Sequence, residues 1–396
     1  MWSELDLPAV FVVGYFALLG AALGSFLNVC ILRWGAEPKQ SVMHPPSRCP
    51  TCGHAIRWYE NVPIVSWIAL RGKCAGCGTR ISPMYPAIEA ATAVLWGASA
   101  ALYGPSLSAV ELAVATTLLL GIAVTDARAF IIPHEFSLGG TVIALAFAAW
   151  PEPIGVLAAV QGALFGAGLV LLVGEVTELV LGQEAMGGGD CALMGMVGAF
   201  FGWESVWPVL ALGALIGLAL HLGMTLRRRA PTEPAEPAPP GLRWGRLMLL
   251  LAGGIVLVGL MVAAASAGVL GGVLRAIFYA VVGAGAAYYL SFLLPKRVPG
   301  GPITQVWGLL GAALGIAIGT AHWIGIMAGL ALGGGALAWA SRRTVEASPV
   351  TIEELGEQGY LPFGIGLSIA AVVLAYSGWF ARAREIVADL AIGLGV

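Results

Sequence analysis

Two aspartates set in an otherwise apolar sequence are the side chains best suited to chemistry. Asp126 ends a long apolar run, and Asp190 follows three consecutive glycines at 187–189 between two further runs. A charged side chain at the centre of a bilayer costs about 2.5–3.5 kcal/mol or more, so an acid at membrane depth indicates a functional site. Two carboxyl groups brought together can share a proton and activate water. We therefore take Asp126 and Asp190 as candidate catalytic residues.

Each aspartate also has a structural interpretation that the sequence leaves open. Asp126 could pair with Arg128 at a helix end, because Pro133 should end or kink the helix that runs here. Asp190 could cap a helix that begins at Cys191. The three glycines before it disfavour a helix and let a second backbone or a substrate come close.

Four of the six cysteines form a second candidate site. They make up two CxxC motifs, at 49–52 and 74–77, separated by 21 residues in a polar block rich in proline and arginine. Such turns let two pairs of thiolates converge on one tetrahedral ion. The pattern predicts a structural zinc site with four ligands, Cys49, Cys52, Cys74 and Cys77. A redox or disulfide pair is the alternative, and His44 and His54 are possible substitute ligands.

The other polar residues of the apolar runs are expected to have structural roles. Cys30 and Cys191 fit small packing residues. Glu89 lies just inside the second predicted span. Glu175 and Glu178 lie one helical turn apart and could form a further acid pair, although a polar stripe facing neighbouring helices suits them better.

The composition decides the class of protein. Of 396 residues, 59% are hydrophobic and only 11% are charged, whereas soluble domains average about 25% charged residues. The sequence therefore predicts an all-α polytopic membrane protein, and the 56 glycines suit close helix packing in lipid. The net charge of −2 argues against nucleic acid as a partner.

The apolar runs, some of them short and abutting, predict about eleven transmembrane helices. The twelve runs lie near 9–32, 87–102, 107–124, 136–150, 156–181, 191–201, 206–226, 247–270, 273–294, 304–320, 323–340 and 361–379. Lysines and arginines gather in the block that follows the first helix, which places this block in the cytoplasm. Alternating the spans from there puts both aspartates at the cytoplasmic face.

These runs divide the chain into five parts. The first part is a helix at 1–32, followed by a small cytoplasmic zinc-binding domain of four cysteines at 33–86. A catalytic transmembrane core follows at 87–226. The last two parts are a linker with an inserted helical module of unknown role at 227–360, and a last helix with its tail at 361–396.

Several motifs, in order, resemble those of the type IV prepilin peptidases, which are GxGD-type aspartyl proteases. The match covers roughly 14–226 and 361–378. The first-helix motif is GSFLNV at 24–29, and the cysteine-bearing domain has CPTC at 49–52, NVPIVSW at 61–67, RGKC at 71–74 and YPAIE at 85–89. Asp126 with Ile132 and Pro133, and GGGD at 187–190 with Gly198, Gly202 and Trp203, resemble the two aspartate motifs. LPFG at 361–364 resembles the start of the family's last helix.

The resemblance implies an enzyme of a bacterial inner membrane that cleaves the leader of prepilins and pseudopilins on the cytoplasmic side. It further implies N-methylation of the new N-terminus with S-adenosylmethionine. Two features depart from the family pattern. Ala192 stands where the family usually has a lysine, and the segment 227–359 has no counterpart in shorter members.

Three other functions remain open at this point. They are a different GxGD intramembrane protease of presenilin type, a proton-coupled membrane transporter, and a non-enzymatic membrane scaffold with a zinc-binding head. The cysteine domain favours the pilin-leader interpretation.

Overall fold

The computed structural model describes residues 9–36, 38–150, 154–181, 187–227 and 363–378, with residues 281 and 380 as single positions. The chain divides into two compact units, the first formed by 1–217 and 346–384 and the second by 218–345 and 385–396. Both candidate sites lie in the first unit. The four spans predicted between 247 and 340 lie outside the described residues, apart from residue 281.

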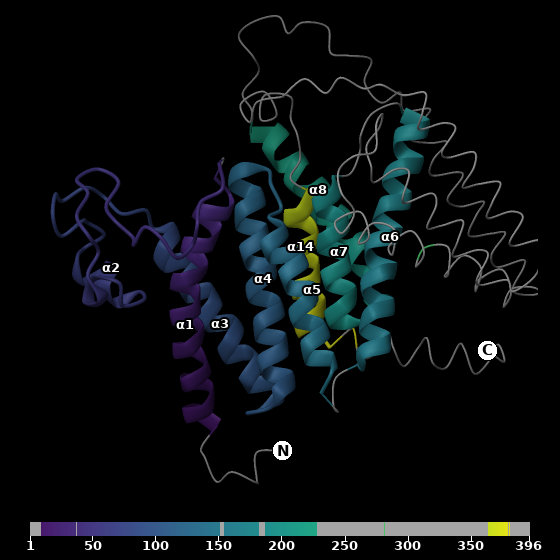
Figure 1. The fold of residues 1–396 in the computed structure, drawn as a ribbon, viewed down its shortest axis with the longest axis horizontal. Helices are drawn as coiled ribbons and strands as arrows, with labels where there is room; N and C mark the ends of the chain where they lie inside the picture. The colour runs from purple at the N-terminus through teal and green to yellow at the C-terminus, as the bar shows by residue number, and fades with distance from the viewer. Residues whose placement is uncertain are drawn as a thin grey trace, which may run out of the picture. The chain divides into compact units, whose positions relative to one another are not determined.

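The described elements are helical, as the sequence predicts (Figure 1). The longer helices are α1 (Ala9–Trp34), α3 (Met84–Tyr103), α4 (Leu107–Ala129), α5 (His134–Ala148), α6 (Val156–Leu181), α7 (Gly188–Phe201), α8 (Val206–Arg227) and α14 (Phe363–Tyr376). Short elements are α2 (Val65–Ala69), η1 (Trp58–Glu60) and η2 (Trp203–Ser205). Each of the predicted apolar runs that falls in this part of the chain became a helix, with ends shifted by only a few residues.

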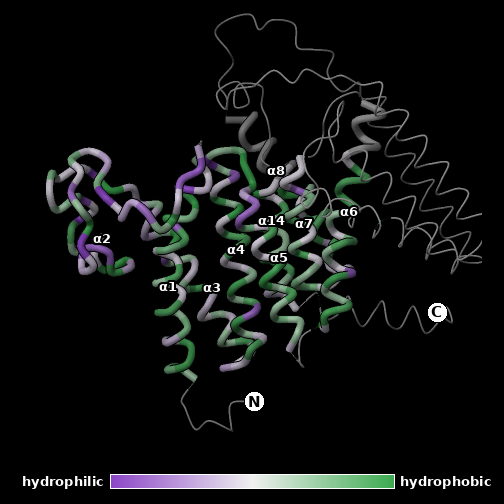
Figure 2. Tube along the Cα trace, viewed as in Figure 1, coloured by the Kyte–Doolittle hydropathy of each residue, from purple (hydrophilic) through white to green (hydrophobic). Residues whose placement is uncertain are grey.

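Three of the described helices are long and apolar enough to cross a membrane: Ala9–Trp34, Leu107–Ala129 and the part of α6 from Val156 to Gly174. Helices α5, α7 and α14 are apolar but shorter. Figure 2 shows hydrophobic residues along the helices and hydrophilic stretches in the segment between α1 and α3. This contrast agrees with a membrane-embedded bundle that carries a polar insertion after its first helix.

Local sequence explains where α4 begins and ends. The Ser106 hydroxyl accepts a hydrogen bond from the backbone N–H of Ala109, at 3.2 Å, and so caps the first turn. At the other end Phe130 adopts a left-handed conformation with φ of 53°, which stops the helix. Pro133 then precedes α5, as expected for a residue that cannot continue a helix. The full length of α4 therefore separates Ser106 from Asp126.

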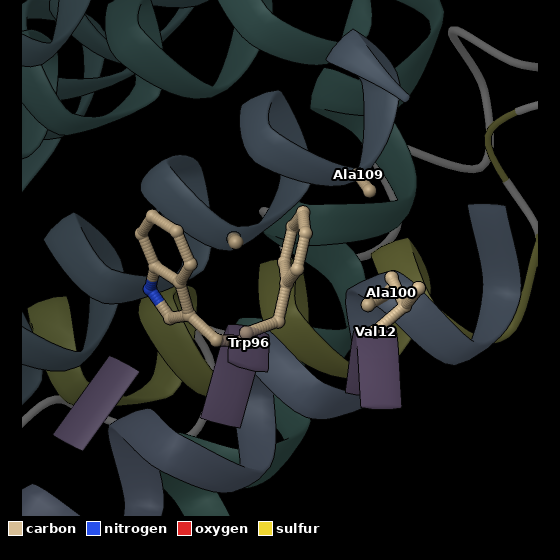
Figure 3. Close-up of a cluster of buried hydrophobic side chains, with 6 residues drawn as sticks. Val12, Trp96, Ala100 and Ala109 are labelled. Atoms are coloured by element: carbon tan, nitrogen blue, oxygen red, sulfur yellow. The ribbon is translucent and has the colours of Figure 1, made fainter. Parts of the chain in front are cut away.

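An apolar cluster fixes the end of the bundle opposite Asp126 (Figure 3). Phe16 of α1 and Trp96 of α3 lie with their ring centroids 6.0 Å apart. The buried members of the cluster come from three helices and are Val12, Phe16, Trp96, Ala100, Ala109 and Ala113. Their burial holds α1, α3 and α4 together.

Glycines allow α6 and α7 to pack with their backbones in contact. A Cβ atom added to Gly162 would lie 2.0 Å from the carbonyl oxygen of Gly198, and one added to Gly166 would lie 2.1 Å from that of Met194. No side chain fits at such distances, so the glycine content serves helix packing here as expected for helices in lipid. This contact sets the position of α7, which carries Asp190.

Candidate active site and metal centre

Asp126 is a buried carboxylic acid near the C-terminal end of α4. Its side chain is only 4% exposed, and the helix ends three residues later at Ala129. The Asp126 carbonyl accepts the N–H of Phe130, at 2.9 Å, which closes the last turn. The expected helix boundary beside Asp126 is therefore present. Arg128 does not pair with Asp126 in the described part of the chain. Its guanidinium instead contacts the Met84 Sδ at 2.9 Å. The predicted Asp126–Arg128 pair is therefore wrong.

Asp190 is the third residue of α7 and is 9% exposed. Its Oδ2 accepts a hydrogen bond from the backbone N–H of Gly187, at 3.2 Å. The capping interpretation is thus correct in part, but the helix begins at Gly188 rather than at Cys191 because the first turn accommodates two of the glycines. The other oxygen, Oδ1, is buried and has no hydrogen-bond partner among the residues that the structure describes. That oxygen therefore keeps a hydrogen-bonding capacity that no described residue uses.

The two carboxyl groups lie close enough to interact electrostatically. The connection between α4 and α5 touches the first turn of α7, because a Cβ atom added to Gly189 would lie 2.9 Å from the Cβ of Ile132. The N-terminus of α14 reaches the same place, where the N–H of Ile365 donates to Asp126 Oδ2 at 3.0 Å. Three helix ends therefore meet at the aspartates, and this contact of α14 is one that sequence reasoning missed.

The other acids singled out in the sequence lie elsewhere. Glu89 is buried in α3, and its Oε2 accepts the backbone N–H of Ile64, at 2.7 Å. Ile64 has a positive φ of 63°, a strained conformation for a β-branched residue. Glu89 therefore anchors the polar block to α3. The side chains of Glu175 and Glu178 lie outside the described residues.

The four cysteines converge in the polar block, each pair within its own small hairpin. The N–H of Cys49 donates to the His54 carbonyl at 2.9 Å, and that of Cys74 donates to the Thr79 carbonyl at 2.8 Å. A glycine follows each pair, Gly53 with φ of 72° and Gly78 with φ of 73°. These two positions need the left-handed conformation that glycine adopts freely. Each hairpin contains this same turn, which directs its two thiols toward the other hairpin.

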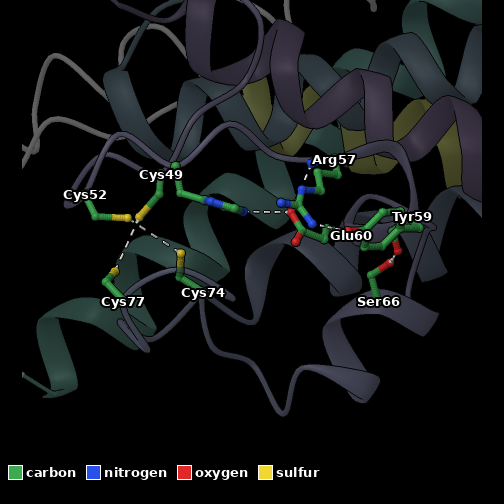
Figure 4. A network of polar contacts seen from close by, with 9 residues as sticks. Cys49, Cys52, Arg57, Tyr59, Glu60, Ser66, Cys74 and Cys77 are labelled. Atoms are coloured by element: carbon green, nitrogen blue, oxygen red, sulfur yellow. Dashed lines mark hydrogen bonds and ion pairs between the residues drawn. The ribbon is translucent and has the colours of Figure 1, made fainter.

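The arrangement of the sulfur atoms fits a zinc ion (Figure 4). All four Sγ atoms lie within 4.8 Å of one another. The Cys49–Cys77 and Cys52–Cys74 Sγ atoms are 3.9 and 4.0 Å apart. Four thiolates at about 2.3 Å from a tetrahedral zinc lie about 3.8 Å apart. The cysteines are free thiols rather than disulfides, so the predicted ligand set is assembled without a disulfide pair.

The electrostatics of the cysteine cluster also favour a cation. The backbone N–H of Cys52 lowers the pKa of Cys49, and the hydroxyl and then the backbone N–H of Thr79 lower the pKa of Cys77 to about 6. The N–H of His54 acts in the same direction on Cys52, but contact with the other sulfurs outweighs it and raises the pKa of Cys52 to about 12. Four thiolates in contact repel one another, and a divalent ion would relieve that repulsion.

His54 is a neighbour of the cysteines rather than a substitute ligand. Its Nε2 lies 3.0 Å from Glu60 Oε2, and Glu60 also accepts the backbone N–H of Arg57 at 3.0 Å. The backbone N–H of Arg57 and then the His54 side chain lower the pKa of Glu60. Figure 4 shows Arg57, Tyr59 and Glu60 beside the cysteines. The network braces the first hairpin.

Several contacts hold the polar block at the end of the bundle where Asp126 lies. Lys39 forms an ion pair with Glu135 in the first turn of α5, at 2.9 Å. The Asn28 Nδ2 near the end of α1 donates to the Tyr85 carbonyl at 3.2 Å. The buried Cys30 and Cys191 are packing residues, as expected. The cysteine cluster and the aspartates thus belong to the same end of the helices.

Comparisons with known proteins give a consistent family. The model described as the bacterial peptidase A24 N-terminal domain matches residues 18–103, and the model of the type IV leader peptidase family matches residues 113–222. The first match contains the four cysteines, and the second contains both aspartates. No solved structure matches the chain.

Curated relatives carry the same name, prepilin leader peptidase/N-methyltransferase. The protein from Myxococcus xanthus is 38% identical over 240 residues, which cover 57% of this chain and 69% of the relative. One from Burkholderia pseudomallei is 33% identical over 270 residues, covering 62% and 87%. One from Pseudomonas aeruginosa is 36% identical over 249 residues, covering 57% and 84%. These matches favour the leader-peptidase interpretation over a presenilin-type protease, a transporter or a scaffold. The chain belongs to the type IV leader peptidase family.

Proposed function

We propose that Asp126 and Asp190 are the catalytic pair of a membrane aspartic endopeptidase that removes the leader peptide of prepilins and pseudopilins. One observation carries this assignment. Two buried carboxyl groups from separate helices lie near enough to interact electrostatically, and one of their oxygens, Asp190 Oδ1, has no partner in the described part of the chain. Burying two acids close together is costly, so the arrangement is expected at a functional site.

The chemistry needs one ionised and one protonated carboxyl group, which the close approach of two acids enforces. The ionised group takes a proton from a water molecule, whose oxygen adds to the scissile carbonyl carbon. The protonated group donates to the carbonyl oxygen, and the departing amine then receives a proton. The two protons belong to the pair, so neither aspartate is assigned a fixed role.

The same proposal includes the membrane arrangement. We place the chain in a bacterial inner membrane as a multi-pass protein of about eleven helices, with the domain at 33–86 and both aspartates on the cytoplasmic side. The substrate's apolar helix stays in the bilayer, and only its leader enters the site. The polar block and Asp126 lie at one end of the bundle, which supports a common face for both.

Zinc would have a structural role, held by Cys49, Cys52, Cys74 and Cys77. Four thiolate ligands complete a tetrahedral shell and leave no open position for a substrate. When bound, the ion supplies a cross-link between the two hairpins. It replaces the apolar core that a domain of about 50 residues rarely builds alone.

N-methylation of the new N-terminus is the second proposed activity, with S-adenosylmethionine as the methyl donor. The names of the curated relatives support it. Mass spectrometry of a prepilin processed by the purified protein tests this activity directly. An added methyl group on the mature N-terminus is expected in the presence of the donor, and an unmodified product would leave a peptidase alone.

Substitution of the aspartates tests the peptidase. Asp126→Asn and Asp190→Asn should each lower the rate of prepilin cleavage by about a thousandfold or more, because each removes one member of a pair that acts as a unit. Cleavage is measured by the mass of the product from the purified protein in detergent. Arg128→Gln, two residues from Asp126 but outside the pair, is the matched control and should cleave normally.

A full rate in either Asn variant would contradict the assignment. A prepilin whose cleavage site is altered should remain uncut by the wild type, which separates leader cleavage from a contaminating protease.

A further inference from the structure

The first turn of α14 holds one oxygen of Asp126 from more than two hundred residues away in the sequence. The backbone N–H of Ile365 donates to Asp126 Oδ2 at 3.0 Å, and the backbone of Gly364 interacts with the same carboxyl group. The first N–H groups of a helix have no partners within the helix. Here they bind a carboxylate, which is the ligand that a helix N-terminus favours.

The far end of α14 is anchored independently. The Tyr376 hydroxyl donates to the Leu95 carbonyl at 2.6 Å and lies 2.9 Å from the Ser99 Oγ. Both partners belong to α3, and Tyr376 also lies 3.4 Å from the Thr116 hydroxyl of α4. Because these contacts fix the helix along its axis, its first turn stays at the level of Asp126.

Gly364 makes the approach possible. A Cβ atom added there would lie 2.8 Å from Asp126 Oδ2 and 2.7 Å from Ile132 Cδ1. Both atoms are ends of side chains, so an alanine at 364 would displace the carboxyl group rather than the helix. Gly366 differs in this respect, since its added Cβ would lie 2.5 Å from the backbone oxygen of Gly213 in α8.

We propose that the first turn of α14, at Gly364 and Ile365, is a positioning element for the catalytic reaction that fixes Asp126 Oδ2 by backbone hydrogen bonds. The inference rests on the proposed catalytic role of Asp126. With Oδ2 held by the backbone, Oδ1 is the oxygen left to exchange a proton with water. α14 belongs to the active site although it contributes no acidic, basic or nucleophilic side chain.

Two variants remove this positioning by different means. Ile365→Pro deletes the N–H donor in the first helical turn, where proline is tolerated because no intrahelical hydrogen bond is lost. Gly364→Ala keeps the donor but pushes the carboxyl group aside. Each should lower kcat for prepilin cleavage by about ten- to a hundredfold, because small displacements of a reacting group cost that much. KM should remain close to the wild-type value.

Matched controls separate positioning from damage to the fold. Ile369→Ala shortens an exposed side chain one turn further along α14 and should retain kcat within about twofold. Gly366→Ala strains the contact of α14 with α8, and should lower thermal stability more than Gly364→Ala does. Methylation of a pre-cleaved pilin provides a second readout, which Ile365→Pro and Gly364→Ala should leave unchanged.

The outcomes distinguish the two proposals. If Asp126→Asn is inactive while Ile365→Pro and Gly364→Ala cleave like Ile369→Ala, the catalytic assignment stands and the positioning role is wrong. Equal losses of kcat in all four α14 variants, or a parallel loss of methylation, would also overturn it, because a structural defect would explain them. Full cleavage by Asp126→Asn would overturn both proposals together.

Discussion

At the scale of single residues, each aspartate has one oxygen bound to backbone, which under the proposed function leaves the other oxygen for chemistry. Asp126 Oδ2 accepts the N–H of Ile365, and Asp190 Oδ2 accepts that of Gly187. Asp190 Oδ1 is buried without a described partner, which costs about 1–3 kcal/mol for a polar atom. Such a cost is retained in proteins where the group has a function. The bound oxygens set the orientation of each carboxyl group before substrate enters.

Ala192 illustrates how a departure from the family pattern is accommodated. The related enzymes that the sequence resembles usually have a lysine at this position. Here the residue is fully buried in the second turn of α7. A lysine would need either a partner or a path to solvent. The packing around α7 therefore suits alanine, and no charge from position 192 acts on Asp190.

Glu60 gives a prediction for pH dependence. Its pKa is lowered by the Arg57 N–H and by His54, so its contribution to stability is complete above its ordinary pKa of about 4.3. That contribution is lost as the pH falls through the lower folded-state pKa. Glu60→Gln should weaken zinc retention by about tenfold or less. It should also abolish the loss of stability that protonation of Glu60 causes at acidic pH. Zinc release titrated with a colorimetric chelator between neutral and acidic pH measures both effects.

Glu204→Gln, which alters an acid in η2 outside the cysteine block, is the control and should release zinc as the wild type does. Identical release curves for Glu60→Gln and the wild type would show that the Glu60 network does not brace the metal site.

At the scale of elements, both sites are made where chain segments end. The aspartates meet at the end of α4 and the starts of α7 and α14. Helix ends expose unpaired backbone groups, which can bind carboxyl groups that a helix middle could not. The cysteines meet at the tips of two hairpins that share one design, a CxxC turn closed by a left-handed glycine. The two hairpins also approach each other at Gly76, where an added Cβ atom would lie 3.0 Å from the His54 Cβ. A metal ion held by the four sulfurs would strengthen this link.

Loss of one ligand should therefore undo the whole cysteine block. Cys52→Ser should reduce bound zinc from about one ion per chain to nearly none, because three thiolates and a hydroxyl hold zinc far less well than four thiolates. The block should then be cut rapidly by a soluble protease, while the helices remain inserted. Metal content by elemental analysis and limited proteolysis measure this.

Cys30→Ala removes a buried cysteine outside the block and is the control, with full zinc expected. A Cys52→Ser protein that keeps stoichiometric zinc would contradict the four-ligand site.

At the scale of the whole molecule, the proposed catalytic parts flank a long segment that the family matches do not include. The matches end at residue 222, and α14 begins at residue 363, yet α14 contacts Asp126 directly. The last helix must therefore enter the membrane in the orientation that brings its N-terminus to the aspartates. The four spans predicted between 247 and 340 are an even number, which preserves that orientation.

Removal of the intervening segment should then leave cleavage intact. A chain that joins residue 227 to residue 361 through a flexible linker of about 15 residues should process prepilin within about tenfold of the full chain, because the two aspartates and α14 are all retained. Prepilin processing in a host that lacks its own peptidase measures this. A version that also lacks 361–378 is the control and should be inactive, since it loses the donors to Asp126. Loss of cleavage in the first deletion, with normal membrane insertion, would show that the segment is needed for catalysis.

The class of protein, the described helices and the candidate groups could be predicted from the amino-acid sequence alone. Long apolar runs of spanning length leave a helix as the main way to satisfy backbone hydrogen bonds in lipid, so α1, α4 and α6 were predictable almost to their ends. The two CxxC motifs identified the candidate metal ligands because their spacing suits a tetrahedral site. Asp126 and Asp190 stood out because isolated charges are costly in an apolar run.

Which atoms meet became visible only in the folded chain. It showed that Asp190 lies inside the first turn of α7, that Arg128 turns away from Asp126, and that Ile365 supplies a backbone donor. A backbone N–H carries no signature in side-chain chemistry, and a contact across 239 positions leaves no periodic pattern in the sequence. Such contacts depend on how the helices pack, which is set by many small apolar and glycine contacts acting together.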